Sequence, residues 1–248
     1  MFSPPVALAS LSGRSDADWA RAAEPFVGAA FLGGIAIDEA TREAARDLVA
    51  RDRSEFLPPD PLAFVDEQLE ALEDASLRPG FNVRSATVGP LRDVARICAD
   101  HDAILEINAH CRQEELVAAG SGHALLRDDD RLAEYVAAAA GTGATVSVKV
   151  RTEADGVDLP ATARRIDDAG TDVIHLDAMD SEPVVRDVVD ATDAFVIANN
   201  EVRDRESVHE YLSYGADAVS VGRPSDDPRV LRRVRQTTRE WFDENRTE

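Results

Sequence analysis

The chain contains a single lysine, Lys149, inside the strand-like run Thr145–Arg151, whereas the other 26 of its 27 basic residues are arginines. Side chains alternate between the two faces of a strand, so Lys149 shares a polar face with Ser147 and Arg151 while valines occupy the other face. That polar face must meet water, a ligand or a partner charge. A lysine there can stabilise negative charge on a ligand, or attack a carbonyl group as a Schiff-base nucleophile. Lys149 is therefore the first candidate functional residue.

A second reactive side chain, Cys111, follows the strand-like run at 104–108 and precedes a segment at 112–122 that we expect to be a loop. Its neighbours His110 and Arg112 are cationic when protonated, and such neighbours lower the pKa of a thiol. Cys111 is therefore a candidate catalytic residue, with an inert loop cysteine as the alternative interpretation. Asn108, just before it, is a candidate for orienting a substrate together with Arg151.

Two further strand ends carry groups that suit a phosphate. One strand-like run ends in Ser220-Val221-Gly222-Arg223 before a helix, and the preceding one ends in Ala198-Asn199-Asn200-Glu201. Backbone amides near Gly222, a helix start and the guanidinium of Arg223 would together bind an anionic oxygen.

The elements that must position these groups alternate along the chain. Apolar runs predict strands at 6–10, 27–32, 80–84, 104–108, 145–150, 173–177, 195–198 and 218–221. Amphipathic segments predict helices at 16–23, 38–51, 61–74, 89–99, 130–140, 160–169, 182–190, 205–214 and 228–245. This alternation predicts the α/β class and a (β/α)8 TIM barrel, with residues 1–248 forming a single domain. A doubly wound open sheet is the alternative, and the connection at 51–79 fits the pattern least well.

In such a barrel the apolar strand faces pack against the helices, and the other faces line the interior. The predicted interior set is polar: Asn82, Arg84, Glu106, Asn108, Ser147, Lys149, Arg151, His175, Asp177, Asn199 and Ser220. Most of these residues lie in the C-terminal halves of their strands, where active sites of this fold occur. A ligand site at the barrel mouth is the favoured interpretation. A purely structural salt bridge of Lys149 with Glu106 or Asp177 is the alternative.

The composition is strongly acidic, with 27 basic and 48 acidic residues giving a net charge of −21. With the scarcity of lysine, this charge indicates a halophile, and an acidic exterior shows no broad nucleic-acid-binding face. Screening at high salt means that charge alone does not exclude an RNA substrate. No run approaches the roughly 20 apolar residues of a membrane span. We therefore expect a cytoplasmic protein with no membrane partner, and the pattern specifies no oligomeric state.

Neither cysteine nor histidine spacing suggests a metal or a disulfide framework. The two cysteines are Cys98, on an amphipathic helix pattern, and Cys111. Cys98 is expected in the core, and no ligand spacing links the histidines to either cysteine. The sequence thus predicts no metal site.

Several ordered motifs together resemble the dihydrouridine synthase family of flavin-dependent, tRNA-modifying TIM barrels. The segment around Cys111 resembles Asn-x-Gly-Cys-Pro, with Cys111 at the catalytic cysteine, and residues 120–126 resemble Gly-Ser-Gly-Ala-Ala-Leu-Leu. Residues 148–152 resemble Val-Lys-Ile-Arg-Thr, with Lys149 at the flavin-contacting lysine. Residues 197–202 resemble Ile-Gly-Asn-Gly-Asp-Ile, and Gly222-Arg223 match the phosphate-binding Gly-Arg. Short archaeal relatives of this family are the most similar in layout.

The chain also departs from the family pattern. Cys111 lies between His110 and Arg112 instead of glycine and proline, and Arg84 stands near the family's flavin-contacting glutamine. The strand-six motif keeps His175, but Asp177 replaces an arginine. We expect the family's C-terminal tRNA-holding helical domain to be missing after the last barrel helix, which weakens the case for tRNA as a partner. A small-molecule or nucleotide substrate is equally expected.

The resemblance implies an FMN-dependent oxidoreductase that reduces the C5=C6 bond of a uracil-type base, with NADPH or NADH as electron donor. Cys111 would donate a proton, and Lys149 would stabilise the reduced flavin. The implied cofactor-binding residues are Arg84, Lys149, His175, Asn199, Asn200, Gly222 and Arg223. The alternatives are a non-catalytic barrel that binds a phosphate ligand, and a flavin-free lyase that forms a Schiff base on Lys149.

Overall fold

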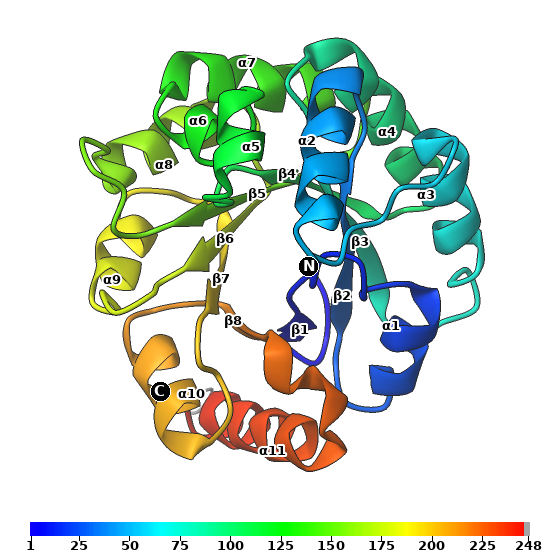
Figure 1. The fold of residues 1–248 in the computed structure, drawn as a ribbon. Helices are drawn as coiled ribbons and strands as arrows, with labels where there is room; N and C mark the ends of the chain where they lie inside the picture. Colours follow the sequence, from blue (N-terminus) through cyan, green and yellow to red (C-terminus); the bar gives the residue numbers. More distant parts are fainter. Residues whose placement is uncertain (246–248) are drawn as a thin grey trace.

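The computed structural model, which describes residues 1–245, contains eight parallel strands that close into one barrel in chain order (Figure 1). The closure runs from β1 through each successive strand to β8, which pairs back to β1. The strands are β1 (Val6–Leu8), β2 (Ala29–Ala36), β3 (Arg78–Arg84), β4 (Ile104–Asn108), β5 (Thr145–Arg151), β6 (Val173–Asp177), β7 (Phe195–Asn199) and β8 (Ala218–Val221). The predicted TIM barrel is confirmed, and the open-sheet alternative is wrong.

Helices form the outer ring around this barrel (Figure 1). They are α1 (Ala17–Ala23), α2 (Glu39–Ala50), α3 (Pro61–Glu70), α4 (Val88–Asp100), α5 (Glu114–Ala118), α6 (His123–Leu126), α7 (Asp129–Ala140), α8 (Leu159–Asp168), α9 (Val184–Val189), α10 (Arg205–Ser213) and α11 (Pro228–Asn245), with a 3-10 turn at Arg223–Asp226. The segment expected to be a loop at 112–122 instead contains α5, and α6 follows directly. The prediction of an unstructured loop there was wrong.

Many of the acidic residues begin helices. Six aspartates accept hydrogen bonds from backbone amides of the first turn that follows them: Asp16, Asp38, Asp60, Asp128, Asp158 and Asp204. A side chain in this position satisfies amides that lack a partner within the helix, which stabilises by about 1 kcal/mol each. Part of the acidic composition therefore fixes the helix boundaries.

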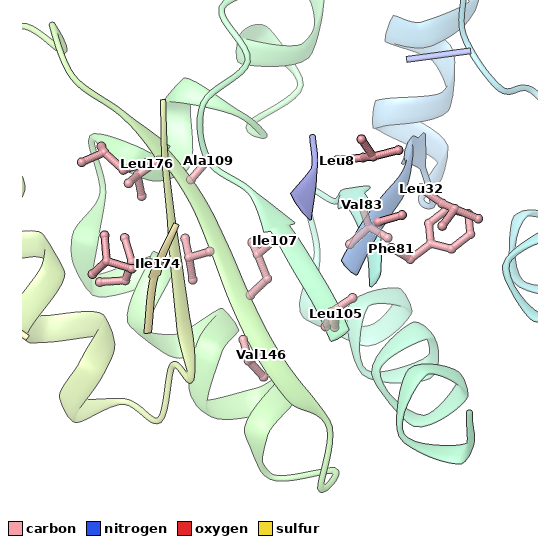
Figure 2. Close-up of a cluster of buried hydrophobic side chains, with 14 of the residues drawn as sticks. Leu8, Leu32, Phe81, Val83, Leu105, Ile107, Ala109, Val146, Ile174 and Leu176 are labelled. Atoms are coloured by element: carbon pink, nitrogen blue, oxygen red, sulfur yellow. The ribbon is translucent and has the colours of Figure 1, made fainter. Parts of the chain in front are cut away.

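The two faces of each strand meet different surroundings. The outward faces pack against the helices in one large apolar core, of which Leu105, Ile107, Val146 and Ile174 are part (Figure 2). The inward faces near the strand starts form a small apolar plug: Ala7, Ala29, Phe31, Ile104, Val173, Ile197 and Ala218. Towards the strand ends the inward faces become polar, which confirms the predicted interior register.

Strand β2 differs most from its prediction. It continues to Ala36 instead of ending at residue 32, because its pairing with β3 resumes after a register shift between Gly33 and Ile35. Glycines at a bulge keep the backbones close, and a Cβ at Gly33 would come within 2.4 Å of the Asn82 carbonyl oxygen. Within residues 1–245, no helix has the length and apolar character needed to cross a bilayer.

Candidate active site

A hydrogen-bonded polar layer fills the barrel above the apolar plug, and the fully buried carboxylate of Glu106 lies at its centre. Asn82 Nδ2 donates to Glu106 Oε1 at 2.7 Å, and Ser147 Oγ lies 3.3 Å from Glu106 Oε2. His175 Nδ1 lies 2.6 Å from the same Oε2, and its Nε2 lies 2.7 Å from Ser220 Oγ. A buried carboxylate is tolerated only when its charge is compensated in this way.

The protonation states in this layer follow from those contacts. Burial disfavours the Glu106 carboxylate, but His175, Lys149 and Asn82 together hold its pKa below the ordinary value. Burial and the charge of Lys149 lower the pKa of His175, although Glu106 opposes them. The layer therefore contains an ionised Glu106 and a neutral His175 that donates from Nδ1 and accepts the Ser220 hydroxyl at Nε2.

Lys149 lies next to this layer and is almost entirely buried, with 3% of its surface exposed. Among the residues described, its ammonium group has no direct hydrogen-bond or ion-pair partner. Glu106 is instead bonded to His175, and Asp177 makes no ion pair with Lys149. The alternative of a structural salt bridge on Lys149 was therefore wrong, and an ammonium that faces the cavity without an ion-pair partner is suited to an anionic ligand.

A cavity of about 860 Å³ opens at the barrel mouth, and Lys149 forms part of its wall. Five cationic side chains line it: Arg14, Arg53, Lys149, Arg203 and Arg223. Three acidic side chains also line it: Asp52, Asp177 and Glu201. Five positive and three negative charges give a formal excess of +2, on a chain whose net charge is −21. Arg14 pairs with Asp226 at 2.7 Å and Arg203 with Glu201 at 3.1 Å. Among the described residues, the cavity cations without an ion pair are therefore Arg53, Lys149 and Arg223, and these are the groups available to an anion.

The wall formed by the ends of β7 and β8 has the features predicted for a phosphate. Gly222 borders open space, since a Cβ built there would meet no protein atom within 4 Å. Arg223 is exposed and makes no hydrogen bond or ion pair with the described residues. Asn199 also lines the cavity, with its Nδ2 donating to the Ser220 carbonyl oxygen at 3.0 Å.

The backbone at the end of β7 is strained. Asn200 has φ 129° and Glu201 has φ 49°, both in the region that favours glycine, and both residues line the cavity. Asn200 is held in place because its Nδ2 donates to the Met179 carbonyl oxygen at 2.9 Å, and Tyr211 Oη donates to the Asn200 carbonyl oxygen at 3.0 Å. Strain maintained by such bonds is typical of ligand sites.

Cys111 lies at the end of β4 but does not line the mouth cavity. It is buried in a small cluster with Ala44 and Leu48 of α2 and Leu116 of α5. The expected pKa-lowering cation, His110, is itself neutral, because burial and nearby cations hold its pKa well below the ordinary value. That expectation was therefore wrong for His110. The guanidinium groups of Arg84 and Arg151 both interact with Cys111.

Four other predicted site residues lie outside the mouth cavity. Arg84 is fully buried and bonds Glu55 and Ser12, and His175 lies in the polar layer. Asn108 donates to Asn82 Oδ1 and accepts from the Cys111 amide at 3.1 Å. Arg151 borders a separate cavity of about 360 Å³ beside α8. The structure thus brings together Lys149, Asn199, Asn200, Gly222 and Arg223 at the mouth, and the contacts of the others are structural or lie elsewhere.

Sequence analysis did not predict several of the residues that line the mouth cavity. His110 was considered only as a neighbour of Cys111. Asp177 was considered as an interior residue, an altered family position and a salt-bridge partner of Lys149, but not as a site residue. Arg14, Arg53 and Arg203 come from loops after β1, α2 and β7. No local pattern distinguishes these arginines from those on the surface, although the poor fit of the connection at 51–79 was a sign of unusual structure. Within residues 1–245, no three His, Cys, Asp or Glu side chains converge as metal ligands would.

Over most of its length the chain is similar to dihydrouridine synthases and to an uncharacterized archaeal protein. The family model described as dihydrouridine synthase matches residues 81–247. An uncharacterized protein of Methanocaldococcus jannaschii is 27% identical over 230 residues, covering 88% of both chains. The tRNA-dihydrouridine synthase B of Xanthomonas campestris is 27% identical over 173 residues, covering 63% of this chain but only 52% of that enzyme. The aligned region thus spans about half the length of that relative.

Solved structures support the fold alone. A tryptophan synthase complex chain from Pyrococcus furiosus superimposes with a TM-score of 0.60 at 14% identity, covering 98% of this chain and 100% of the other. A mutant FabK from Thermotoga maritima gives a TM-score of 0.59 at 14% identity, covering 89% of this chain and 61% of the other. Both are consistent with the barrel described above.

We expect the protein to lose stability on mild acidification because of His175. A histidine with a depressed pKa binds its proton more weakly in the folded state than in the unfolded state, so stability is full above the ordinary pKa and falls below it. From pH 7 to pH 5 the free energy of unfolding should fall by up to about 1.4 kcal/mol per pH unit per such group once below about pH 6.5. The depressed pKa of Glu106 adds a further loss below about pH 4.5.

Denaturant unfolding at constant molar salt measures this profile. The variant His175→Gln removes one of the titrating groups, so its profile should be flatter than that of the wild type between pH 7 and pH 5. Identical slopes for the two proteins would contradict the neutral, buried state assigned to His175.

Replacement of Asn200 separates backbone strain from hydrogen bonding. Asn200→Gly should stabilise by about 1 kcal/mol, because relief of strain worth about 1–3 kcal/mol outweighs a lost hydrogen bond of about 1 kcal/mol. Asn200→Ala keeps the strain and loses the bond, so it should destabilise. Thermal unfolding compares the two, and a less stable glycine variant would show that the backbone here is unstrained.

Proposed function

Because the chain belongs to the dihydrouridine synthase family, we propose that it is an FMN-dependent oxidoreductase that reduces the C5=C6 bond of a uracil-type base. The observation that carries the proposal is the mouth cavity, with the unpartnered ammonium of Lys149 on one side and the open Gly222-Arg223 wall on the other. The proposal names the base and leaves its carrier, a free nucleotide or an RNA strand, to experiment.

The residues of the mouth cavity fit FMN. The volume of about 860 Å³ falls in the range of small-molecule sites. The space beside Gly222 and the free guanidinium of Arg223 suit a phosphate, and the strand ends of β7 and β8 are a usual phosphate position in this fold. Lys149 suits the polar edge of a ring that becomes negatively charged on reduction. When bound, FMN would supply hydride transfer to the activated double bond.

The chain's own groups then have distinct roles in the proposal. Arg223 and the amides beside Gly222 bind the phosphate and fix its position. Lys149 supplies a positive charge at the cavity wall, and with 3% of its surface exposed this charge is screened less than that of a surface residue. The resemblance implies Cys111 as the proton donor, but in this structure its thiol packs in the apolar cluster under α2 and does not line the cavity. The Cys111 amide donates to Asn108 Oδ1 at 3.1 Å. Arg151 is proposed to orient a substrate that extends towards α8.

The exchange Lys149→Arg tests the proposed function directly. A planar guanidinium cannot replace a compact ammonium in a buried position, so FMN affinity should fall by at least about 10-fold, or about 1.4 kcal/mol. Fluorescence quenching of FMN in molar salt measures the affinity. The matched control is Arg164→Lys on the exposed face of α8, which should leave it unchanged. Wild-type protein that does not quench FMN would overturn the proposed cofactor.

Arg223 should act through the phosphate alone. Arg223→Ala should weaken FMN binding by about 10-fold, the loss expected for one charge-assisted hydrogen bond, and leave riboflavin binding unchanged because riboflavin has no phosphate. Arg164→Ala, near residues 190–193 at the opposite end of the barrel, is the control. An equal loss for both ligands would show that Arg223 shapes the cavity without contacting phosphate.

A further inference from the structure

His110 occupies a position in the mouth cavity that the polar layer does not use. It borders the cavity together with Lys149, whereas the adjacent Cys111 is turned under α2. The His110 imidazole makes no hydrogen bond with any residue described, and its Nδ1 is buried without a partner. Nε2 has no partner among the described residues either and is not sealed from the cavity, so it is the ring nitrogen that a ligand can bond.

The surroundings of His110 keep its ring neutral. Burial and the charges of Lys149, Arg84 and Arg151 lower the pKa of His110. A neutral imidazole offers one N–H donor and one nitrogen acceptor. It is therefore a hydrogen-bonding group for an uncharged polar edge, and not an anion-binding group like Lys149.

His110 also lies nearer the solvent than Lys149. Asn108 is the register partner of Lys149, and the Ala109 amide donates to the Lys149 carbonyl oxygen at 2.9 Å. His110 follows two residues after Asn108, and two residues of extended chain advance at most about 7 Å. A ring bound against Lys149 would thus be covered by a second ring at the level of His110. In the closed barrel, β4 also lies opposite β8 and its proposed phosphate wall.

We propose that His110 is a specificity-determining residue that hydrogen-bonds the polar imide edge of the substrate base, in the outer layer of the mouth cavity. This inference rests on the proposed function, since it takes the inner layer to be the FMN ring. The imide edge of a uracil-type base presents one N–H donor between carbonyl acceptors, and a neutral imidazole can pair with either kind of group.

The test uses uridine 5′-monophosphate as the probe on the purified 248-residue chain in molar salt. Its binding to the FMN-loaded protein is followed by the change in the flavin absorbance band, and its binding to the flavin-free protein by calorimetry. His110→Ala should raise the Kd for the nucleotide by about 10-fold, the loss of one hydrogen bond, while the Kd for FMN changes by less than about two-fold. His110→Gln, whose amide both donates and accepts, should recover most of the affinity.

Each outcome bears on one of the two proposals. An unchanged nucleotide Kd in His110→Ala, or a wild-type protein that binds no nucleotide in either form, overturns the inference about His110. A fall in FMN affinity equal to that for the nucleotide also overturns it, since His110 would then contact the cofactor. Absence of FMN binding in the wild type overturns the proposed function, and the calorimetric comparison still decides the role of His110. Far-UV circular dichroism and the Arg164→Ala control exclude a folding defect.

Discussion

The buried charge of Glu106 is the constraint on which the upper half of the barrel depends. A carboxylate with no exposed surface must be compensated by hydrogen bonds and opposite charge, or it would protonate. Its compensation is distributed over strands: Asn82 on β3, Ser147 on β5 and His175 on β6 bond it, and His175 bonds Ser220 on β8. The network therefore ties opposite sides of the barrel together. Because Glu106 is already bonded to His175, the nearby Lys149 is left without a direct partner. The hydrogen bonds that stabilise the buried Glu106 thus leave the ammonium of Lys149 available to a ligand in the mouth cavity.

Whether the cationic mouth cavity can bind an anion depends on how strongly the acidic exterior repels that anion, and this repulsion depends on salt. At low ionic strength a net charge of −21 repels anions over a Debye length of about 30 Å at 0.01 M salt, but only over about 3 Å at 1 M. In concentrated salt the long-range repulsion therefore disappears, while contacts inside the cavity are screened less. Under those conditions the cavity cations without an ion pair among the described residues, Arg53, Lys149 and Arg223, attract an anion at short range. Because salt screens the long-range repulsion, a strongly acidic exterior is compatible with a phosphate site and does not exclude a nucleotide.

The sequence predicted most of the barrel and roughly half of the candidate site. Strand alternation gave the barrel and the inward faces correctly, because period-two patterning depends only on neighbouring residues. Lys149, Asn199 and Gly222 were placed at the mouth because they lie within strands or directly after them, where register fixes their positions. The misplaced residues depend on packing between elements distant in sequence. Arg84 is held by Glu55 of the α2–α3 connection, and Arg53 reaches the cavity from the same connection. No local pattern encodes such contacts.

Packing between distant elements also decides which of the two neighbours, His110 or Cys111, faces the mouth cavity. Helix α2 lies against α5, and Cys111, not His110, packs in the small apolar cluster between them. Cysteine behaves as a small apolar residue and fills it with Ala44, Leu48 and Leu116, whereas an imidazole there would need a buried polar partner. The chain therefore turns Cys111 inward and His110 towards the cavity. The resemblance expects glycine at position 110, which has no side chain to present. The histidine at this position and the burial of the neighbouring thiol are thus two consequences of one packing arrangement, and the chemistry available on the β4 side of the mouth follows from it.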